Sequence, residues 1–216
     1  MRVKKILNRA VGKIKREGLL KFTRVGIHVI WRYVYLNALV NILYRDLQAP
    51  ISEILPRIDI EIKKVEGDEV IEFKDSVDRA RYLKFENRLT KGREGFVALV
   101  GGRIVCYVWI SFQDEYEPFL GMNIELNQEN GYIYDTYVIP EFRRKGINSA
   151  VCNRALEYIK NRGYKGTLTA VGGKNIPSIR TFKKLGFVEH KVFRVIRIFG
   201  IRFRLSVKSQ GERSHC

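Results

Sequence analysis

The chain has 216 residues, which is enough for one substantial hydrophobic core and an appended segment. Its hydrophobic content of 45% is that of a globular protein, but its net charge of +17 is unusually high. The chain has three widely spaced cysteines and no Cys-x-x-Cys pair, so the sequence predicts neither a disulfide framework nor a zinc site, and no metal is expected. Free thiols of this kind are typical of a reducing cytoplasm.

The excess charge lies at the two ends of the chain, with +9 over residues 1–50 and +5 over residues 187–216. Residues 1–50 are predicted to form a basic amphipathic helical extension. Apolar residues from Ile6 to Ile14 recur on one helical face, and Gly18 ends this helix. A second predicted helix, from Val25 to Tyr44, is apolar on nearly every side.

This second segment is too interrupted to cross a bilayer. Arg24 and Arg32 break it, and its longest run without a charge, Tyr33 to Tyr44, has 12 residues, whereas a span needs about 20. Two interpretations remain open. The segment docks on its own domain or on another protomer, or residues 1–47 lie on an anionic membrane surface. The second interpretation predicts a cytoplasmic protein at the inner face of the membrane.

From Asp59 onward, predicted strands alternate with predicted helices, and two glycines, Gly101 and Gly102, indicate a hairpin turn. The order predicts an α/β fold with a mixed sheet over residues 51–206, followed by a disordered tail over residues 207–216. The expected elements are a strand or hairpin at 59–73, a helix at 76–89, a hairpin at 95–112, a polar loop at 113–130, a strand at 132–139, a helix at 146–160, a strand at 166–171, a helix at 177–185 and a hairpin around residue 200.

The strand at 132–139 ends at Pro140 and is followed by three cations at 143–145, by Gly146 and by a helix. Free amides and the dipole at a helix N-terminus favour an anion, and a glycine lets a ligand come close to the backbone. The stretch therefore indicates a phosphate site. The same residues also fit an ordinary connection between a strand and a helix, and this alternative stays open.

A second stretch, Asn175 to Phe187, changes the balance, because the two stretches together resemble the GCN5-related N-acetyltransferase family. The Arg/Gln-x-x-Gly-x-Gly/Ala motif of that family matches Arg143 and Gly146, but Asn148 stands at its last position. The family's ending, Asn…Ala/Ser-Ile…Tyr-x-x-Leu-Gly-Phe, matches the second stretch except at Phe182. The resemblance implies the mixed-sheet fold of this family.

The resemblance also implies acetyl-CoA as the acyl donor. Backbone amides of residues 143–148 would hold its pyrophosphate, the strand at 137–139 would pair with its pantetheine arm, and one strand amide would polarise the thioester carbonyl. Many relatives have a tyrosine where this chain has Phe182, and phenylalanine cannot protonate the departing thiolate. The implied acyl-CoA-binding residues are Tyr137, Val138, Ile139, Arg143, Arg144, Lys145, Gly146, Ile147, Asn148, Ser149, Asn175 and Phe182.

The acceptor amine must lose a proton, and a carboxylate can accept it. Asp135, on the strand beside the expected thioester, and Glu125, in the loop on the acceptor side, are the two candidates for this general base. Both also fit plain surface carboxylates. From Ile104 to Phe142 the chain has seven Asp or Glu and no Lys or Arg. This stretch predicts an acceptor that carries an ammonium group.

The resemblance thus implies an N-acyltransferase for a small-molecule amine. The basic prefix also resembles extensions on relatives associated with surface polysaccharide assembly, which implies an amino sugar, nucleotide- or lipid-linked, as the acceptor. The alternative is a non-catalytic module of this fold that binds nucleic acid or a membrane. The wide apolar side of the prefix fits a bilayer interface better than nucleic acid, so nucleic acid is the less favoured partner. Self-association through the prefix stays open.

Overall fold

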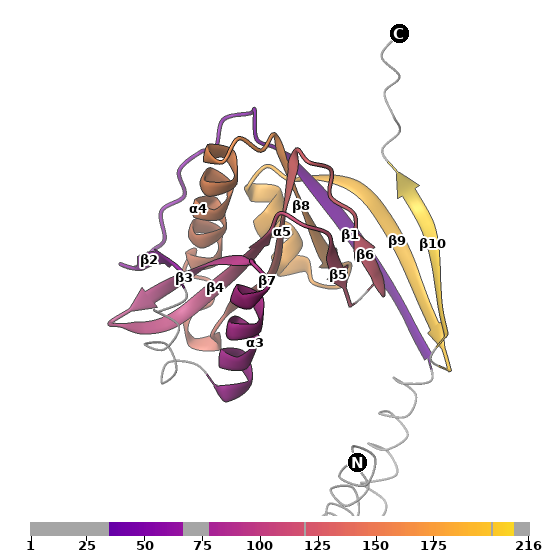
Figure 1. The fold of residues 1–216 in the computed structure, drawn as a ribbon, viewed down its shortest axis with the longest axis horizontal. Coiled ribbons are helices and arrows are strands. Elements are labelled where there is room, and N and C mark those ends of the chain that lie inside the picture. Colours follow the sequence, from indigo (N-terminus) through magenta and orange to yellow (C-terminus); the bar gives the residue numbers. More distant parts are fainter. Residues whose placement is uncertain (1–34, 67–77, 119, 200, 210–216) are drawn as a thin grey trace, which may run out of the picture.

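The computed structural model describes residues 35–66, 78–118, 120–199 and 201–209. They form a mixed eight-stranded sheet in the order β10-β9-β1-β8-β7-β4-β3-β2 and a two-stranded sheet of β5 and β6 (Figure 1). The elements are β1 (Tyr35–Asp46), β2 (Glu61–Lys64), α3 (Arg79–Thr90), β3 (Glu94–Val100), β4 (Arg103–Ser111), β5 (Glu115–Glu117), β6 (Met122–Ile124), β7 (Asn130–Val138), η2 (Pro140–Phe142), α4 (Ile147–Asn161), β8 (Gly166–Gly172), α5 (Ile176–Lys184), β9 (Val188–Ile198) and β10 (Ile201–Ser209).

Strand β1 corrects the prediction of a helix up to Tyr44. Residues 35–46 pair antiparallel with both β8 and β9 and lie inside the sheet. Val40, Ile42 and Leu43 are buried. From Val40 to Arg45 the strand is covered on both faces, and such a segment is apolar without alternation, so periodicity does not distinguish its sequence from that of a buried helix.

The predicted domain boundary at residue 50 is therefore wrong, because β1 belongs to the core of the domain. The rest of the predicted extension, residues 1–34, lies outside the described residues. At the other end β10 continues to Ser209, so the predicted disordered tail is wrong for residues 207–209. Residues 210–216 lie outside the described part.

The remaining elements follow the predicted order. The hairpin turn at Gly101 and Gly102 is confirmed between β3 and β4. Helix α3 begins later than expected, with Asp78 as its N-cap accepting a hydrogen bond from the Arg81 amide at 3.0 Å. The start of the predicted helix, before residue 78, and the end of the predicted first hairpin lie outside the described residues. The predicted loop at 113–130 contains the short hairpin β5–β6.

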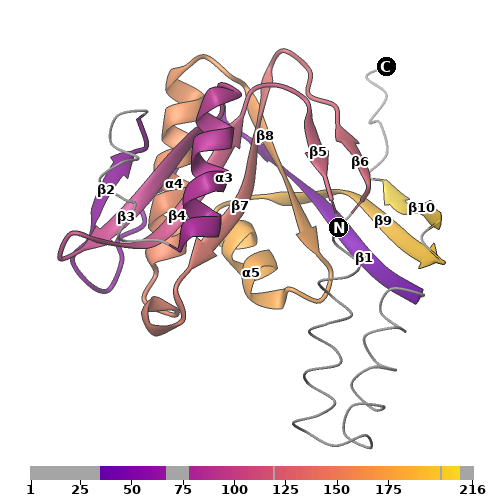
Figure 2. The same ribbon diagram turned by 60° about the horizontal axis from the view of Figure 1, so that its bottom comes forward.

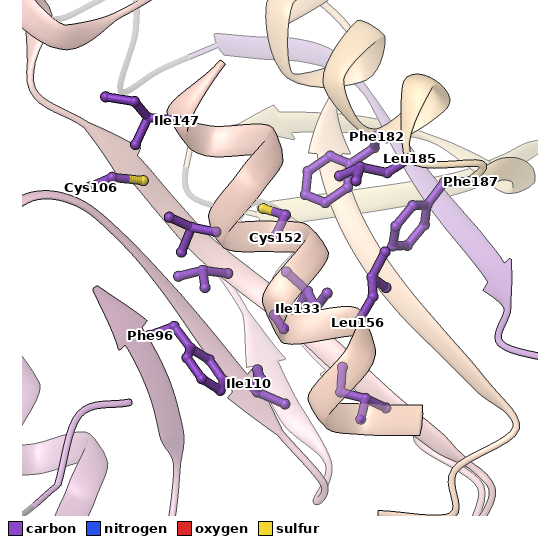
Figure 3. Close-up of a cluster of buried hydrophobic side chains, with 14 of the residues drawn as sticks. Phe96, Cys106, Ile110, Ile133, Ile147, Cys152, Leu156, Phe182, Leu185 and Phe187 are labelled. Atoms are coloured by element: carbon purple, nitrogen blue, oxygen red, sulfur yellow. The ribbon is translucent and has the colours of Figure 1, made fainter. Parts of the chain in front are cut away.

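Strand alternation in β3 and β4 divides the core between the two faces of the sheet. Phe96, Cys106 and Ile110 pack with α4 and α5 in one cluster (Figure 3). Val97 and Trp109 pack with Phe85 of α3 in the other. The two helix layers therefore cover opposite faces of the sheet, with α3 on one side and α4 on the other (Figure 2).

Candidate active site

Strands β7 and β8 separate after a short pairing. They are parallel neighbours only from Asn130–Tyr132 on β7 and Gly166–Leu168 on β8. Beyond this point β7 follows β4 through a β-bulge, in which Asp135 has a φ of 43°. Strand β8 instead continues along β1, with pairs up to Gly172. A gap therefore opens in the middle of the sheet, between the carboxyl ends of two neighbouring strands.

A pocket of about 710 Å³ lies at this gap. One wall comes from β7 and the opposite wall from β8 and the start of α5, while α3, the β5 strand and β1 close the remaining sides. The lining includes Asp135 and Thr136 on β7, Thr169 to Gly173 after the separation on β8, and Asn175, Ser178 and Phe182 beyond it. The second motif of the sequence thus lines the pocket, whereas residues 137–149, which include the first motif, are not part of its lining.

The N-terminus of α4 has the geometry of an anion site. Its first intrahelical bond runs from the Ala150 amide to the Gly146 carbonyl, so the amides of residues 147–149 have no carbonyl four residues earlier within the helix. Gly146 is the N-cap, with a φ of 81° and no side chain to occupy these amides. Arg144 before it also has a left-handed φ, of 62°. Such a turn presents backbone N–H groups to a phosphate.

The reason for the glycine differs from the one expected. A Cβ on Gly146 would lie 3.3 Å from the Pro56 Cα atom, and the neighbouring Arg57 amide donates to the Lys145 carbonyl at 2.8 Å. The segment that leads to β2 therefore packs on this side of the turn. Glycine is needed for this contact and for its positive φ, rather than for ligand approach alone.

Asn148 stands where the family motif has a glycine or an alanine. Its Oδ1 atom lies 3.9 Å from the thiols of both Cys106 and Cys152, which are buried between α4 and the sheet. Burial raises the pKa of Cys152 to about 12, so this thiol stays protonated and can donate. The asparagine side chain thus faces the protein, and Ile147 and Ser149 beside it are buried. These positions offer a ligand their backbone, as the motif requires.

The amides at the end of β7 differ in availability. The Ile139 amide donates to the Val105 carbonyl at 3.0 Å and is therefore used within the fold. The Val138 carbonyl accepts a hydrogen bond from Arg143 Nε at 3.2 Å, outside the β4 ladder. Because N–H and C=O groups alternate sides along a strand, the Val138 amide faces the gap. Of the predicted Tyr137–Ile139 stretch, Val138 is the residue placed to meet a ligand in the gap.

Asn175 and Phe182 both line the pocket. Asn175 is the N-cap of α5, and its side-chain oxygen accepts from the Ser178 amide at 3.3 Å. Phe182 is buried and packs edge-on against Phe187, with ring centroids 5.0 Å apart. Its ring therefore completes the hydrophobic core at the back of the gap and supplies no proton.

Asp135, the first candidate base, lies in the pocket but is paired. Its carboxylate is 2.5 Å from Arg88 Nη2, and the Arg88 guanidinium stacks over the rings of Trp109 and Tyr134 at 5.1 and 5.2 Å. Burial raises the pKa of Tyr134 to about 12, so its hydroxyl stays protonated at neutral pH. The pair holds the Asp135 side chain in one position at the bulge.

The acidic stretch of the sequence is compensated in the same way. Glu115 also lines the pocket, and its carboxylate lies 2.6 Å from Arg93 Nε. Cations from α3 and from the start of β3 thus meet the acids of β5 and β7. The lining carries Lys84, Arg88, Lys91, Arg93 and Lys174 against Glu115, Glu117 and Asp135. The expectation of a strongly acidic acceptor site is therefore not met by the pocket as a whole.

Glu125, the second candidate base, follows β6 and is exposed, and it is not among the residues that line the pocket. Glu117 is there instead, and it escaped the sequence analysis. It is 8% exposed and accepts a hydrogen bond from the Tyr132 hydroxyl at 3.0 Å. Burial and the Glu117 charge raise the pKa of Tyr132, which keeps the phenol protonated as the donor. Nothing in the polar stretch around Glu117 separates it from its acidic neighbours.

Comparison with known proteins agrees with this geometry. Residues 62–187, more than half of the chain, match the sequence model of the Acetyltransferase (GNAT) family. The chain belongs to this family. A GCN5-related N-acetyltransferase of Sphaerobacter thermophilus has the same fold, with a TM-score of 0.55 and 13% identity over 85% of this chain and 56% of that one. The GNAT fold predicted from the two motifs is thus confirmed.

Two relatives are similar in sequence over part of their length. An uncharacterized N-acetyltransferase of Methanocaldococcus jannaschii is 36% identical over 104 residues, which are 46% of this chain and 41% of that protein. YwnH of Bacillus subtilis is 29% identical over 101 residues, which are 46% of this chain and 57% of that protein. The chain thus matches about half the length of these relatives. Among its described residues, no helix is both long and apolar enough to cross a membrane.

Proposed function

We propose that this GNAT protein transfers an acetyl group from acetyl-CoA to the amine of a small-molecule acceptor. One observation carries the proposal. Asn148 at the start of α4 contacts the Cys106 thiol, and Cys106 stands opposite Val138 at the end of β7, so the uncapped N-terminus of α4 lies at the end of the strand that borders the gap. This arrangement suits a ligand with a pyrophosphate at one end and a long, hydrogen-bonding arm that ends in a thioester.

In this proposal the amides of residues 146–149, with the cations at 143–145, hold the pyrophosphate of acetyl-CoA. The pantetheine arm enters the gap along β7, toward Asn175 and Phe182. The Val138 amide donates to the thioester carbonyl oxygen, which becomes negatively charged as the amine attacks. One preorganised donor of this kind contributes about 3 kcal/mol to transition-state stabilisation.

The chemical step forms one C–N bond and breaks one C–S bond. The neutral amine attacks the thioester carbonyl carbon, and the tetrahedral intermediate expels the thiolate of CoA. Because Phe182 has no proton to donate, the thiolate leaves as the anion or takes its proton from water. The proton lost by the amine goes to a pocket carboxylate, directly or through water, and Asp135 is our first candidate.

We further propose an amino sugar as the acceptor. The pocket is large enough for a sugar, and its tyrosines and paired charges offer hydrogen bonds to hydroxyl groups. Its mixed charge also suits a nucleotide- or lipid-linked sugar, because Lys84, Lys91 and Lys174 on the lining can face a phosphate. The alternative, a non-catalytic module of the same fold, predicts acetyl-CoA binding at most and no transfer.

Two measurements test the proposal in sequence. Calorimetry with acetyl-CoA should show binding in the micromolar range, and a panel of free and nucleotide-linked amino sugars, amino acids and polyamines should reveal an acceptor by release of CoA thiol. Mass spectrometry would identify the acetylated product. Binding without transfer to any amine of the panel would favour the non-catalytic alternative, and absence of binding would refute the proposed function.

A further inference from the structure

The edge of the sheet formed by β1, β9 and β10 exposes an unusual number of large apolar side chains. Phe199 at the turn between β9 and β10 is 79% exposed, and Ile201 and Phe203 on β10 are 63% and 51% exposed. Strand β10 is the outermost strand of the sheet, at the end far from β2 (Figure 1). A long apolar edge strand is a liability in water unless something covers it.

The strand register places these side chains on one face. Tyr35, Ile198 and Ile201 stand opposite one another across the three strands, and Phe203 stands opposite Ile196. Residues directly opposite share a face of the sheet. The rows continue with Leu39, Arg194 and Leu205, so one cation stands among the apolar side chains. We call the set Tyr35, Leu39, Ile196, Ile198, Ile201, Phe203 and Leu205 the outer apolar face.

The opposite face of the same strands is already covered. Val40, Val195 and Phe193 pack there with residues of the β5–β6 hairpin. Arg204, which alternates with the apolar residues of β10, donates to the Gly121 carbonyl at 3.0 Å. The arginines of β10 are thus turned toward the protein or its rim, and the apolar side chains toward the outside.

Charge discriminates between the molecules that could cover the outer apolar face. From Val188 to Ser209 the chain has six Lys or Arg and one Glu. Arg194 stands on the outer apolar face itself, and Arg197, Arg202 and Arg204 belong to the opposite face of the same strands. Residues 1–34, which join β1 at the first row of the face, have ten Lys or Arg and one Glu. Like charge therefore opposes covering by this segment, and in a symmetric dimer it would bring two copies of the basic hairpin together.

An anionic partner would be attracted to the positive charge of this region, and an apolar partner would bury its exposed side chains. Nucleic acid meets the first requirement only, because it offers no apolar surface to aliphatic side chains such as Ile201 and Leu205. An anionic lipid bilayer meets both, since its headgroups attract Arg194 and the net positive charge of the β9–β10 hairpin, and its acyl boundary accepts the apolar side chains.

We propose that the outer apolar face, with the β9–β10 turn at Phe199, is a docking surface for an anionic membrane. The proposal does not depend on acetyltransferase activity. Residues 1–34 carry ten Lys or Arg and are joined to this face at Tyr35, so a bilayer contact of their charges would add to that of the outer apolar face. Two weak contacts acting together make reversible binding effective, where one alone is marginal.

The experiment places an environment-sensitive NBD dye at the turn of the full-length chain. Phe199→Cys is labelled in a Cys216→Ser background, where the two remaining cysteines, Cys106 and Cys152, are buried. Leu83→Cys, an exposed apolar position on α3, is the matched control. With vesicles of phosphatidylcholine and phosphatidylserine, the label at 199 should brighten and be quenched by lipid-borne nitroxide, while the label at 83 should not respond.

A second pair of variants measures the contribution to binding. Phe203→Ser with Leu205→Ser should lower the partition coefficient on these vesicles about tenfold, since two partly inserted apolar side chains are lost. Leu83→Ser should leave it unchanged, and thermal unfolding would check that both proteins are folded. An unresponsive label at 199 overturns the proposal, as does equal response at both sites. A label that responds to RNA alone, or that is already shielded in a dimer without lipid, identifies another occupant and also overturns it.

Discussion

The cationic turn before α4 should contribute measurably to acetyl-CoA affinity. The test replaces Arg144 and Lys145 together by glutamine, which removes two charges and keeps side chains of similar polarity. Residue 144 has a φ of 62°, and this left-handed conformation is about as unfavourable for glutamine as for arginine. The carbonyl of Lys145 keeps its hydrogen bond from the Arg57 amide, which no side chain takes part in.

The expected magnitude follows from Coulomb's law. At a separation of about 5 Å in water, one pair of unit charges interacts by about 0.8 kcal/mol. Two cations facing a pyrophosphate thus supply about 2 kcal/mol before screening. At physiological salt the Debye length is about 8 Å, and screening removes about half of this energy. The double variant should therefore bind acetyl-CoA about fivefold more weakly, and at 1 M salt the difference should shrink to about twofold.

Calorimetry at the two salt concentrations measures both values. The matched control is Lys160→Gln, which removes one exposed cation from the last turn of the same helix. Residue 160 lies about 20 Å from the turn along α4. The Lys160→Gln variant should therefore bind acetyl-CoA as tightly as the unaltered protein. If the double variant binds as tightly as the control at low salt, the turn does not hold the pyrophosphate and the proposed orientation of the donor is wrong.

Three further predictions concern the proposed chemistry and the fold. Asp135→Asn should lower turnover more than Phe182→Leu, as measured by CoA release across pH; full activity of Asp135→Asn at every pH would make Glu117 the next candidate base. Burial raises the pKa of the Cys152 thiol from 9.0 to about 12. Below pH 9 the thiol is protonated in both the folded and the unfolded chain, and the folded state keeps its full stability. As pH rises from 9 toward 12 the thiol ionises in the unfolded chain first, so the free energy of unfolding falls. Denaturant titrations should therefore show a decline above pH 9 that is smaller in Cys152→Ala, with a slope of at most about 1.4 kcal/mol per pH unit from this thiol. A chain that starts at residue 49 should fail to fold as a stable monomer by gel filtration and circular dichroism, and a cooperative thermal transition in that chain would contradict the role given to β1.

The sequence was sufficient where local rules and tertiary structure agree. Helix α5 has a capping asparagine, a proline in its first turn, two lysines in its last turn and Gly186 after it, and the structure contains each of these signals. The glycine hairpin between β3 and β4 and the turn into α4 are similar cases. Strand β1 was missed because its second half is covered on both faces, while the exposed positions of its first half include the apolar residues Tyr35 and Leu39, so the alternation by which strands are recognised is lost.

The electrostatics of the site could not be predicted, because its ion pairs join residues far apart in the chain. Arg88 on α3 meets Asp135 on β7, and Arg93 at β3 meets Glu115 on β5. A sequence window from residue 104 to 142 holds the acids alone, and their partners lie before it. Buried Glu117 was missed for a related reason, since its partner Tyr132 comes from a strand that pairs with β4 and β8, away from β5 in the chain.

The missed strand also explains the feature on which the proposed function rests. Strand β8 shares three paired positions with β7 but seven with β1, from Gly166 to Gly172. Its last four residues are thus bound to β1 on one side and face the gap on the other, where they line the pocket. By holding β8 along its whole length, β1 lets β7 follow β4 without leaving β8 unsupported. Residues 35–46 therefore help to keep the gap between β7 and β8 open, and part of the N-terminal region predicted to be a separate appendage supplies some of the scaffold of the candidate active site.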